Sequence, residues 1–189
     1  ALPIFLGSPV AHSISPLMHN ESFRLLGLDY VYLCFDVNEE TLPAAVAGLK
    51  TCGIRGFNLT MPNKNKIVEL LDELSPEAQL IGAVNTVLND NGKLIGYNTD
   101  GYGFMQSVRD AGHDITGKNI TVMGVGGASM AICAQSALDG AASVHIFARR
   151  TSRYWNRTQK FAENLSAKTG CQVCLFDNDD HTALRDSIA

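Results

Sequence analysis

Residues 56–64 (Gly-Phe-Asn-Leu-Thr-Met-Pro-Asn-Lys) change their pattern of hydrophobic and polar positions part-way along. Phe57 and Leu59 alternate with Asn58 and Thr60, and this two-residue period predicts an extended segment. The stretch therefore begins as a strand with one apolar face and one polar face.

A helix is predicted directly after this strand. Pro62 disfavours helical backbone at the residue before it and suits the first turn of a helix. The apolar positions that follow keep helical spacing: Ile67, Leu70, Leu71 and Leu74. Lys64 then lies in the first turn, where the positive end of the helix dipole makes a lysine unfavourable. Two interpretations of Lys64 stay open, a solvated surface side chain and a residue retained for chemistry.

The chain before this stretch predicts alternating strands and helices. A strand begins almost immediately, and a loop leads to Ser15-Pro16, a serine N-cap followed by proline at the first helical position. The expected apolar face of that helix comprises Leu17, Met18, Phe23, Leu25 and Leu26. A strand at 30–37 and a helix at 39–51 follow. This β-α-β-α-β order is typical of a parallel sheet covered by helices.

The chain after residue 74 contains turn signals and a second run of alternating elements. Ser75-Pro76-Glu77 predicts a short helix, and Asn91-Gly92 predicts a hairpin turn between strands at 82–88 and 94–97. A helix follows to Gly112, and we place a domain boundary on it, between residues 101 and 102. The remaining elements are expected as a strand at 120–123, a helix through 132–138, a strand at 143–148, a helix at 156–168, a strand at 171–176 and a helix from 180.

Composition and charge narrow the classes of function. The 189 residues are 46% hydrophobic and 18% charged, which indicates a globular protein of one large or two small domains. The net charge of −4 and the pI near 5.7 argue against a nucleic-acid surface. No apolar run approaches the length of a membrane span. Because the first residues lack a basic leader, we expect no signal peptide and a cytoplasmic protein.

The five cysteines are Cys34, Cys52, Cys133, Cys171 and Cys174. An odd number scattered through apolar segments predicts free, buried thiols in a reducing compartment. Cys171 and Cys174 form a lone CxxC pair, but a zinc site needs a second pair or nearby histidines. We therefore expect core cysteines, structural or surface histidines, and no metal site.

Ser13 and Ser15 flank a single residue in the loop after the first strand. Their hydroxyl groups could point the same way in an extended loop. The alternative is that Ser15 only caps the helix and Ser13 only solvates a turn.

A glycine-rich turn, Gly124-Val125-Gly126-Gly127-Ala128-Ser129, follows the strand at 120–123 and precedes a helix. This context is the one that dinucleotide binding requires, because glycines let the backbone approach a pyrophosphate at a helix N-terminus. Ser129 occupies the usual third glycine position, so the motif is a variant. The predicted contacts are Gly124, Gly126, Gly127, Ala128 and Ser129, and a tight turn without a ligand is the alternative.

The loop after the next strand predicts which cofactor binds. NAD enzymes place Asp or Glu about 20 residues after the glycines, whereas this chain has Ala148-Arg149-Arg150-Thr151-Ser152 there. Arg149, Arg150 and Thr151 suit a 2′-phosphate, so NADP is the predicted cofactor and NAD the alternative. The arginines could also be solvated, or Arg149 could stack on the adenine.

Four segments in a fixed order, followed by the glycine turn, carry a resemblance that covers essentially the whole chain. The segments are Ser13–Pro16, Asn58–Lys64, Gly82–Thr86 and Gly96–Gly101. Together they closely resemble the shikimate dehydrogenase family, including its quinate/shikimate dehydrogenase branch. The resemblance implies an α/β fold: an N-terminal substrate domain with a mainly parallel sheet at residues 1–101, then a partial Rossmann NADP-binding domain at 102–189.

The resemblance also implies an activity and a set of roles. The expected reaction is the reversible NADP-linked reduction of 3-dehydroshikimate to shikimate, with quinate as a further substrate. Lys64 matches the family's catalytic lysine and Asp100 its paired aspartate. The expected substrate contacts are Ser13, Ser15, Thr60, Asn85 and Tyr32. Tyr32 could equally be a half-buried strand tyrosine.

One departure from the family and several alternatives remain. Family members continue for roughly a further half of this length and would there supply a glutamine and a tyrosine to the substrate pocket. We therefore expect exposed sheet and helix faces, and poor stability or association, for these residues alone.

An NAD-using quinate dehydrogenase and a non-catalytic metabolite- or nucleotide-binding remnant are the alternative functions. The oligomeric state is left open, with a homodimer as one alternative.

Overall fold

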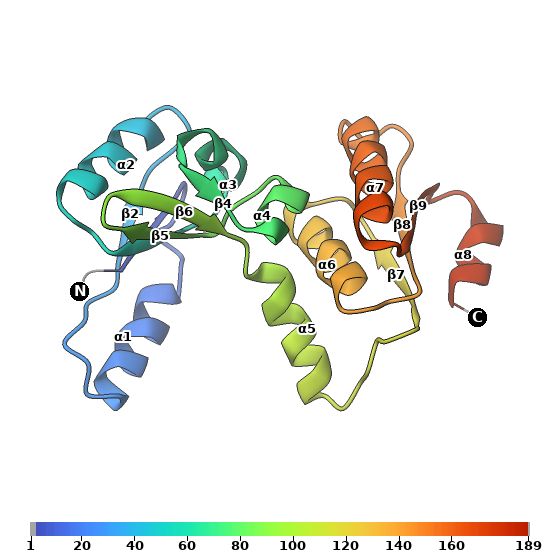
Figure 1. Cartoon of the computed structure of the whole chain (residues 1–189), viewed down its shortest axis with the longest axis horizontal. Helices are drawn as coiled ribbons and strands as arrows, with labels where there is room; N and C mark the ends of the chain where they lie inside the picture. Colours follow the sequence, from blue (N-terminus) through green and yellow to red (C-terminus); the bar gives the residue numbers. More distant parts are fainter. Residues whose placement is uncertain (1–2, 189) are drawn as a thin grey trace. The chain divides into compact units, whose positions relative to one another are not determined.

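The computed structural model describes residues 3–188 and divides into two compact units between Asn98 and Thr99. Figure 1 shows both units in colours that follow the sequence. The predicted domain boundary after residue 101 stays a prediction.

A mixed sheet forms the centre of the first unit. Among residues 3–98 its strands are β1 (Ile4–Gly7), β2 (Leu33–Asp36), β3 (Gly56–Leu59), β4 (Glu73–Leu74), β5 (Thr86–Asp90) and β6 (Lys93–Tyr97). Their order is β2-β1-β3-β5-β6-β4. β1 runs parallel to both β2 and β3, β4 runs parallel to β6, and β5 is antiparallel to its two neighbours. The expected α/β fold with a mainly parallel sheet is confirmed, with one antiparallel strand inserted.

Short helices surround this sheet. They are α1 (Ser15–Leu25), α2 (Leu42–Thr51), α3 (Asn63–Lys66), the 3₁₀ turn η1 (Ile67–Leu70) and α4 (Pro76–Ile81). Leu42 and Val46 of α2 join Phe57 and Leu59 of β3 in one buried cluster. The apolar half of the strand alternation therefore faces this core, and Asn58 and Thr60 alternate with it.

Two turn predictions of the first unit are confirmed. Asn91 and Gly92 both have positive φ, 52° and 94°, which a type I′ hairpin requires, and they join β5 to β6. The Asn89 side-chain oxygen accepts a hydrogen bond from the Gly92 amide at 2.8 Å. Ser75 caps α4, because its hydroxyl oxygen accepts from the Ala78 amide at 3.2 Å.

The predicted helix from Pro62 to Leu74 is wrong in its second half. The helix ends at Lys66, a 3₁₀ turn follows to Leu70, and Leu71 is extended. Glu73 and Leu74 pair with β6 instead, and the Asp72 amide donates to the Leu94 carbonyl at 2.9 Å. Strand pairing satisfies these backbone groups and overrides the helical spacing of the leucines.

The predicted start and burial of α1 are also wrong. Ser15 is the first residue of the helix rather than its N-cap, which is Ile14 without a side-chain capping bond. The helix has no buried residue within the described part of the chain. Its predicted apolar face is exposed, with Leu17 at 76% and Leu25 at 71%. Helical spacing located this helix, but it did not determine what covers its face.

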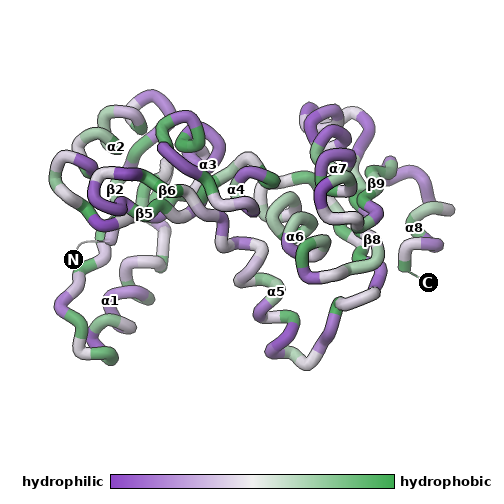
Figure 2. The backbone as a smooth tube through the Cα atoms, viewed as in Figure 1, coloured by the Kyte–Doolittle hydropathy of each residue, from purple (hydrophilic) through white to green (hydrophobic). Residues whose placement is uncertain are grey.

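The second unit contains a parallel βαβαβ arrangement. Its elements within residues 99–188 are α5 (Asp100–Asp110), β7 (Asn119–Met123), α6 (Gly127–Leu138), β8 (Ser143–Ala148), α7 (Trp155–Thr169), β9 (Gln172–Asp177) and α8 (His181–Ile188). The strand order is β7-β8-β9, and both pairs are parallel. α6 packs on β7, β8, α5 and α7, whereas α8 packs on β7. Figure 2 shows α6 as largely hydrophobic and α7 as largely hydrophilic, in keeping with the more central position of α6.

The cysteines and the membrane prediction have separate outcomes. All five cysteines are free, and Cys133 and Cys171 are buried, but Cys52 is exposed. The prediction of buried thiols is therefore wrong for Cys52. No helix within residues 3–188 has the length and hydrophobicity that crossing a bilayer would need.

α5 and α6 approach each other closely at Gly101. A Cβ atom at this position would lie 2.3 Å from the Ala131 carbonyl oxygen, far inside van der Waals contact. That oxygen belongs to the backbone of α6, so it cannot rotate away as a side chain could. Gly103, two residues further along α5, has no described atom within 4 Å of the same point.

We predict that Gly101→Ala destabilises the protein by roughly 1–3 kcal/mol, because the two helices must separate to accommodate the methyl group. Gly103→Ala is the matched control and should be neutral or stabilising by up to about 1 kcal/mol, since alanine is the better helix former. Urea denaturation of both variants measures the difference. Equal stabilities would show that this helix crossing does not depend on glycine.

Candidate functional site

The serine loop and the β3–α3 loop are neighbours at the carboxyl ends of parallel strands. β1 and β3 lie side by side in register, and the Thr60 amide donates to the Leu6 carbonyl at 2.9 Å. Beyond the strands, the Ser8 amide donates to the Met61 carbonyl at 3.0 Å. Ligands of α/β sheets bind outside such strand ends, which makes this edge the candidate substrate site.

Main-chain hydrogen bonds also bring Lys64 and Asn85 to this edge. The Lys64 carbonyl accepts from the Val84 amide at 2.8 Å, and the Asn85 carbonyl accepts from the Leu59 amide at 2.8 Å. The neighbouring Asn63 is fully buried and donates its side-chain amide to the Val37 carbonyl at 2.7 Å. Asn63 therefore anchors α3, and Lys64 lies half-buried on an anchored turn. The structure brings Thr60, Lys64 and Asn85 into one region.

Ser13 and Ser15 are both half-buried in the loop after β1. The Ser13 hydroxyl oxygen accepts from the Ser15 amide at 3.2 Å. Burial raises the pKa of the Cys34 thiol, and Ser13 makes a smaller, opposing contribution. Ser13 thus organises the loop, and both serines stay predictions as substrate contacts.

Tyr32 is buried, and its hydroxyl lies in a polar network. Only 2% of Tyr32 is exposed, and its hydroxyl donates to Asn58 Oδ1 at 3.0 Å. Its ring stacks on His19 with the ring centroids 4.3 Å apart. The Asn20 side chain binds the Tyr32 main chain twice, accepting from its amide and donating to its carbonyl. Tyr32 is therefore a rigid hydrogen-bond donor rather than a half-buried strand residue.

Two residues of this network, Asn58 and Thr86, were not predicted as site residues. Asn58 Nδ2 donates to Thr86 Oγ1 at 3.0 Å, and Thr86 Oγ1 lies 3.0 Å from Asn85 Oδ1. The alternation of β3 contained a signal for Asn58, because this residue shares a strand face with Thr60. Thr86 gave no such signal in the sequence, because its position follows from the pairing of β5 with β3.

Asp100 lies in the second unit as the first residue of α5. A carboxylate in the first turn of a helix interacts favourably with the helix dipole, which is a structural reason for an acid at this position. The pairing of Asp100 with Lys64 stays a prediction.

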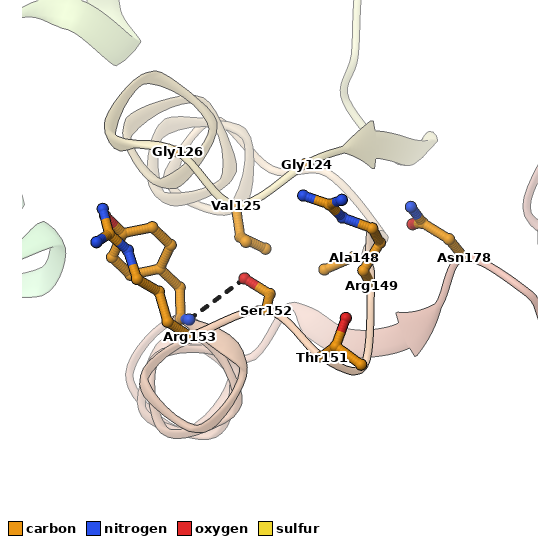
Figure 3. Close-up of a pocket in the computed structure, with 10 residues that line it drawn as sticks. Gly124, Val125, Gly126, Ala148, Arg149, Thr151, Ser152, Arg153 and Asn178 are labelled. Atoms are coloured by element: carbon orange, nitrogen blue, oxygen red, sulfur yellow. Dashed lines mark hydrogen bonds between the residues drawn. The ribbon is translucent and has the colours of Figure 1, made fainter.

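A hollow of about 570 Å³ opens at the carboxyl ends of β7 and β8 in the second unit. Figure 3 shows the glycine turn on one side of it and the loop after β8 on the other. The residues that line it are Gly124, Val125, Gly126, Ala148, Arg149, Thr151, Ser152, Arg153, Tyr154 and Asn178. This is the place where a parallel βαβ unit binds a dinucleotide.

The glycine turn fits a pyrophosphate. Gly124 has φ of 104°, a conformation that side chains rarely adopt. Among the described residues, no atom lies within 4 Å of a Cβ built on Gly126 or Gly127. α6 begins at Gly127 without a side-chain cap, and an uncapped helix N-terminus of this kind favours an anion. Gly127, Ala128 and Ser129 do not line the hollow itself and stay predictions as cofactor contacts.

The two arginines after β8 have different surroundings. Arg149 lines the hollow together with Thr151. The Arg150 guanidinium lies 4.7 Å from the centre of the Trp155 ring and borders a different hollow between α7 and β9. Arg153 lines the first hollow and was not predicted, although it follows Thr151 by only two residues. Asn178, also not predicted, reaches the hollow from the end of β9.

A family model and several relatives of this chain name one family. Residues 5–87 match the family model described as the shikimate dehydrogenase substrate binding domain. A "Shikimate dehydrogenase (NADP(+))" of Listeria innocua is 50% identical over 97% of this chain. A crystal structure of shikimate 5-dehydrogenase from Listeria monocytogenes, in complex with shikimate and NAD, is similar with a TM-score of 0.96 at 49% identity over 99% of this chain.

A shikimate 5-dehydrogenase structure from Thermus thermophilus in complex with shikimate is 34% identical, with a TM-score of 0.76 over 94% of this chain and 68% of its own. The chain belongs to the shikimate dehydrogenase family. It spans 63% of the Listeria innocua relative and 64% of the Listeria monocytogenes structure. The expected family is confirmed.

Burial raises the pKa of Tyr32 to about 12, with a smaller contribution from Cys34. We predict that a tyrosinate absorbance titration shows one of the five tyrosines ionising near pH 12. Because the folded pKa lies above the ordinary value of 10.0, this group's contribution to stability is complete below about pH 10 and is lost as the pH rises through 12. Tyr32→Phe should remove the step near pH 12, and Tyr30→Phe should leave it in place. Retention of that step in Tyr32→Phe would assign it to another tyrosine.

Proposed function

We propose that the complete protein catalyses the reversible NADP-dependent reduction of 3-dehydroshikimate to shikimate. The observation that carries this proposal is the convergence of Thr60, Lys64 and Asn85 beside the serine loop at one edge of the first sheet. Family membership supports it, because a 50% identical relative is named shikimate dehydrogenase (NADP(+)).

The residue types suit reduction of a ring ketone. When bound, the reduced nicotinamide supplies the hydride. Negative charge then develops on the substrate oxygen, and the Lys64 ammonium stabilises this charge and donates the proton. Asp100 orients the ammonium group and shares the proton network. A small polyhydroxy acid also needs several neutral hydrogen-bond partners, which Ser13, Ser15, Thr60 and Asn85 provide.

Arg149 and Thr151 would hold the adenosine 2′-phosphate of NADP. Both line the hollow beside the glycine turn, and the described lining contains no carboxylate that would repel a phosphate. An arginine binds phosphate through charge-assisted hydrogen bonds and favours NADP over NAD. Because the Arg150 guanidinium lies over the Trp155 ring, Arg150 would contribute less than Arg149 to the preference for NADP.

An NAD-dependent quinate or shikimate dehydrogenase is the second candidate. The Listeria monocytogenes neighbour was solved with NAD and shikimate at 49% identity, which favours the use of NAD in this alternative. A non-catalytic binding protein is the alternative of another class.

We also propose a reducing, cytoplasmic location, which the free cysteines support. A homodimer is kept as an open alternative for the oligomeric state.

We predict that Lys64→Ala in the complete protein lowers kcat by about 10²–10⁴-fold, the usual contribution of a general acid, while substrate affinity changes much less. Lys66→Ala is the matched control on the same turn. The Lys66 ammonium pairs with Glu69 at 2.7 Å, and its loss should leave kcat nearly unchanged. Steady-state oxidation of NADPH with 3-dehydroshikimate measures both variants. Unchanged turnover in Lys64→Ala would remove this lysine from the mechanism, and an inactive wild type would favour the non-catalytic alternative.

We predict that Arg149→Ala lowers kcat/KM for NADP by roughly 10–100-fold and changes kcat/KM for NAD little, because NAD lacks the 2′-phosphate. Arg150→Ala should change the ratio of the two cofactors much less. Rates with each cofactor, and with shikimate and quinate in turn, measure these preferences. A wild-type protein that uses NAD more efficiently than NADP would overturn the proposed cofactor.

A further inference from the structure

A continuous chain of hydrogen bonds crosses the first unit from Tyr32 to Asn85. The Tyr32 hydroxyl donates to Asn58 Oδ1 at 3.0 Å, and Asn58 Nδ2 donates to Thr86 Oγ1 at 3.0 Å. The Thr86 hydroxyl then donates to Asn85 Oδ1 at 3.0 Å. The chain ends on a residue that the proposed function places against the substrate.

One main-chain oxygen fixes the orientation of the Asn58 amide in this chain. Asn58 Nδ2 also lies 3.4 Å from the Asn85 carbonyl oxygen, which can only accept. That end of the Asn58 amide must therefore be the NH₂ group, and the other end must accept from Tyr32. Thr86 Oγ1 accepts from Asn58 and donates its own hydrogen to Asn85 Oδ1.

The backbone holds Thr86 in place for this role. Thr86 lies directly opposite Asn58 in the antiparallel β3–β5 pair. Its β-branched side chain has few rotamers in a strand, so its hydroxyl stays between the two asparagine side chains. At the far end, the buried Tyr32 keeps its proton, because its pKa is raised to about 12.

We propose that Thr86 is a positioning residue that sets the orientation of the Asn85 side-chain amide. The Thr86 hydroxyl holds the amide oxygen toward itself, and the NH₂ group therefore faces away from Thr86. The amide then presents a hydrogen-bond donor to the substrate, which matches an acceptor such as a carboxylate or a ring oxygen. This inference rests on the proposed function, because it concerns how the same site binds its substrate.

The test compares Thr86→Val with Thr86→Ser in the complete protein, using shikimate with NADP. Valine keeps the shape and removes the hydroxyl, and should lower kcat/KM for shikimate roughly 10–100-fold, mainly through KM. Serine keeps the hydroxyl and should restore most of the loss. The Kd of NADP, measured by calorimetry, should not change. Thr51→Val, which removes an exposed hydroxyl at the end of α2, controls for hydroxyl loss in general.

A double-mutant cycle with Asn85→Ala separates positioning from folding. If Thr86 acts through Asn85, Thr86→Val should cost little further activity once Asn85 has become alanine. Independent, multiplying losses in kcat/KM would overturn the proposal, as would wild-type kinetics in Thr86→Val. Thr86→Ala provides the same readout if the valine variant does not fold. A wild-type protein without shikimate turnover would overturn the proposed function and this inference together, whereas an active wild type with independent losses would overturn only the inference.

Discussion

The register of β3 between β1 and β5 is the constraint on which the first unit depends. Phe57 and Leu59 are buried in the core, and the same alternation places Asn58 and Thr60 on the opposite face. A slip of one residue would exchange the two faces, exposing the core residues and burying the polar ones. The free energy that holds the hydrophobic core in register therefore also positions the candidate substrate site.

In the second unit, backbone geometry at glycines has the corresponding role. Gly124 turns the chain out of β7 with a positive φ, and the Gly124 amide still donates to the Phe147 carbonyl at 2.8 Å. This bond keeps the turn attached to β8, whose end carries Arg149. Gly101 then allows α5 to approach the backbone of α6. Glycine backbone positions form one side of the hollow, and side chains of the loop after β8 form the other.

The sequence predicted elements whose signals are local. Asn91-Gly92 and Ser75-Pro76 act through their own φ angles and side chains, so their predictions held. The helical spacing up to Leu74 failed because Glu73 and Leu74 find strand partners in β6, about twenty residues further along the chain. Ser15 failed as a cap because it is already the first residue of the helix and Ile14 takes the N-cap position. Arg149 and Arg150 are adjacent in sequence, but their side chains point in different directions. Arg149 lines the hollow, whereas Arg150 lies over the Trp155 ring.

The candidate site shows the same division between local and non-local information. Asn85 and Thr86 are neighbours at the start of β5, whereas Asn58 belongs to β3, and only the pairing of these two strands brings Asn58 Nδ2 within 3.0 Å of Thr86 Oγ1. A reversed Asn58 amide would place its oxygen against the Asn85 carbonyl oxygen, and this hydrogen bond would be lost. The Tyr32 and Thr86 hydroxyls can donate or accept, so they do not oppose the reversal. The lost hydrogen bond contributes about 1 kcal/mol, and an unsatisfied buried group costs about 1–3 kcal/mol more. A neutral main-chain oxygen can therefore set the orientation of this amide without placing a charge beside the substrate.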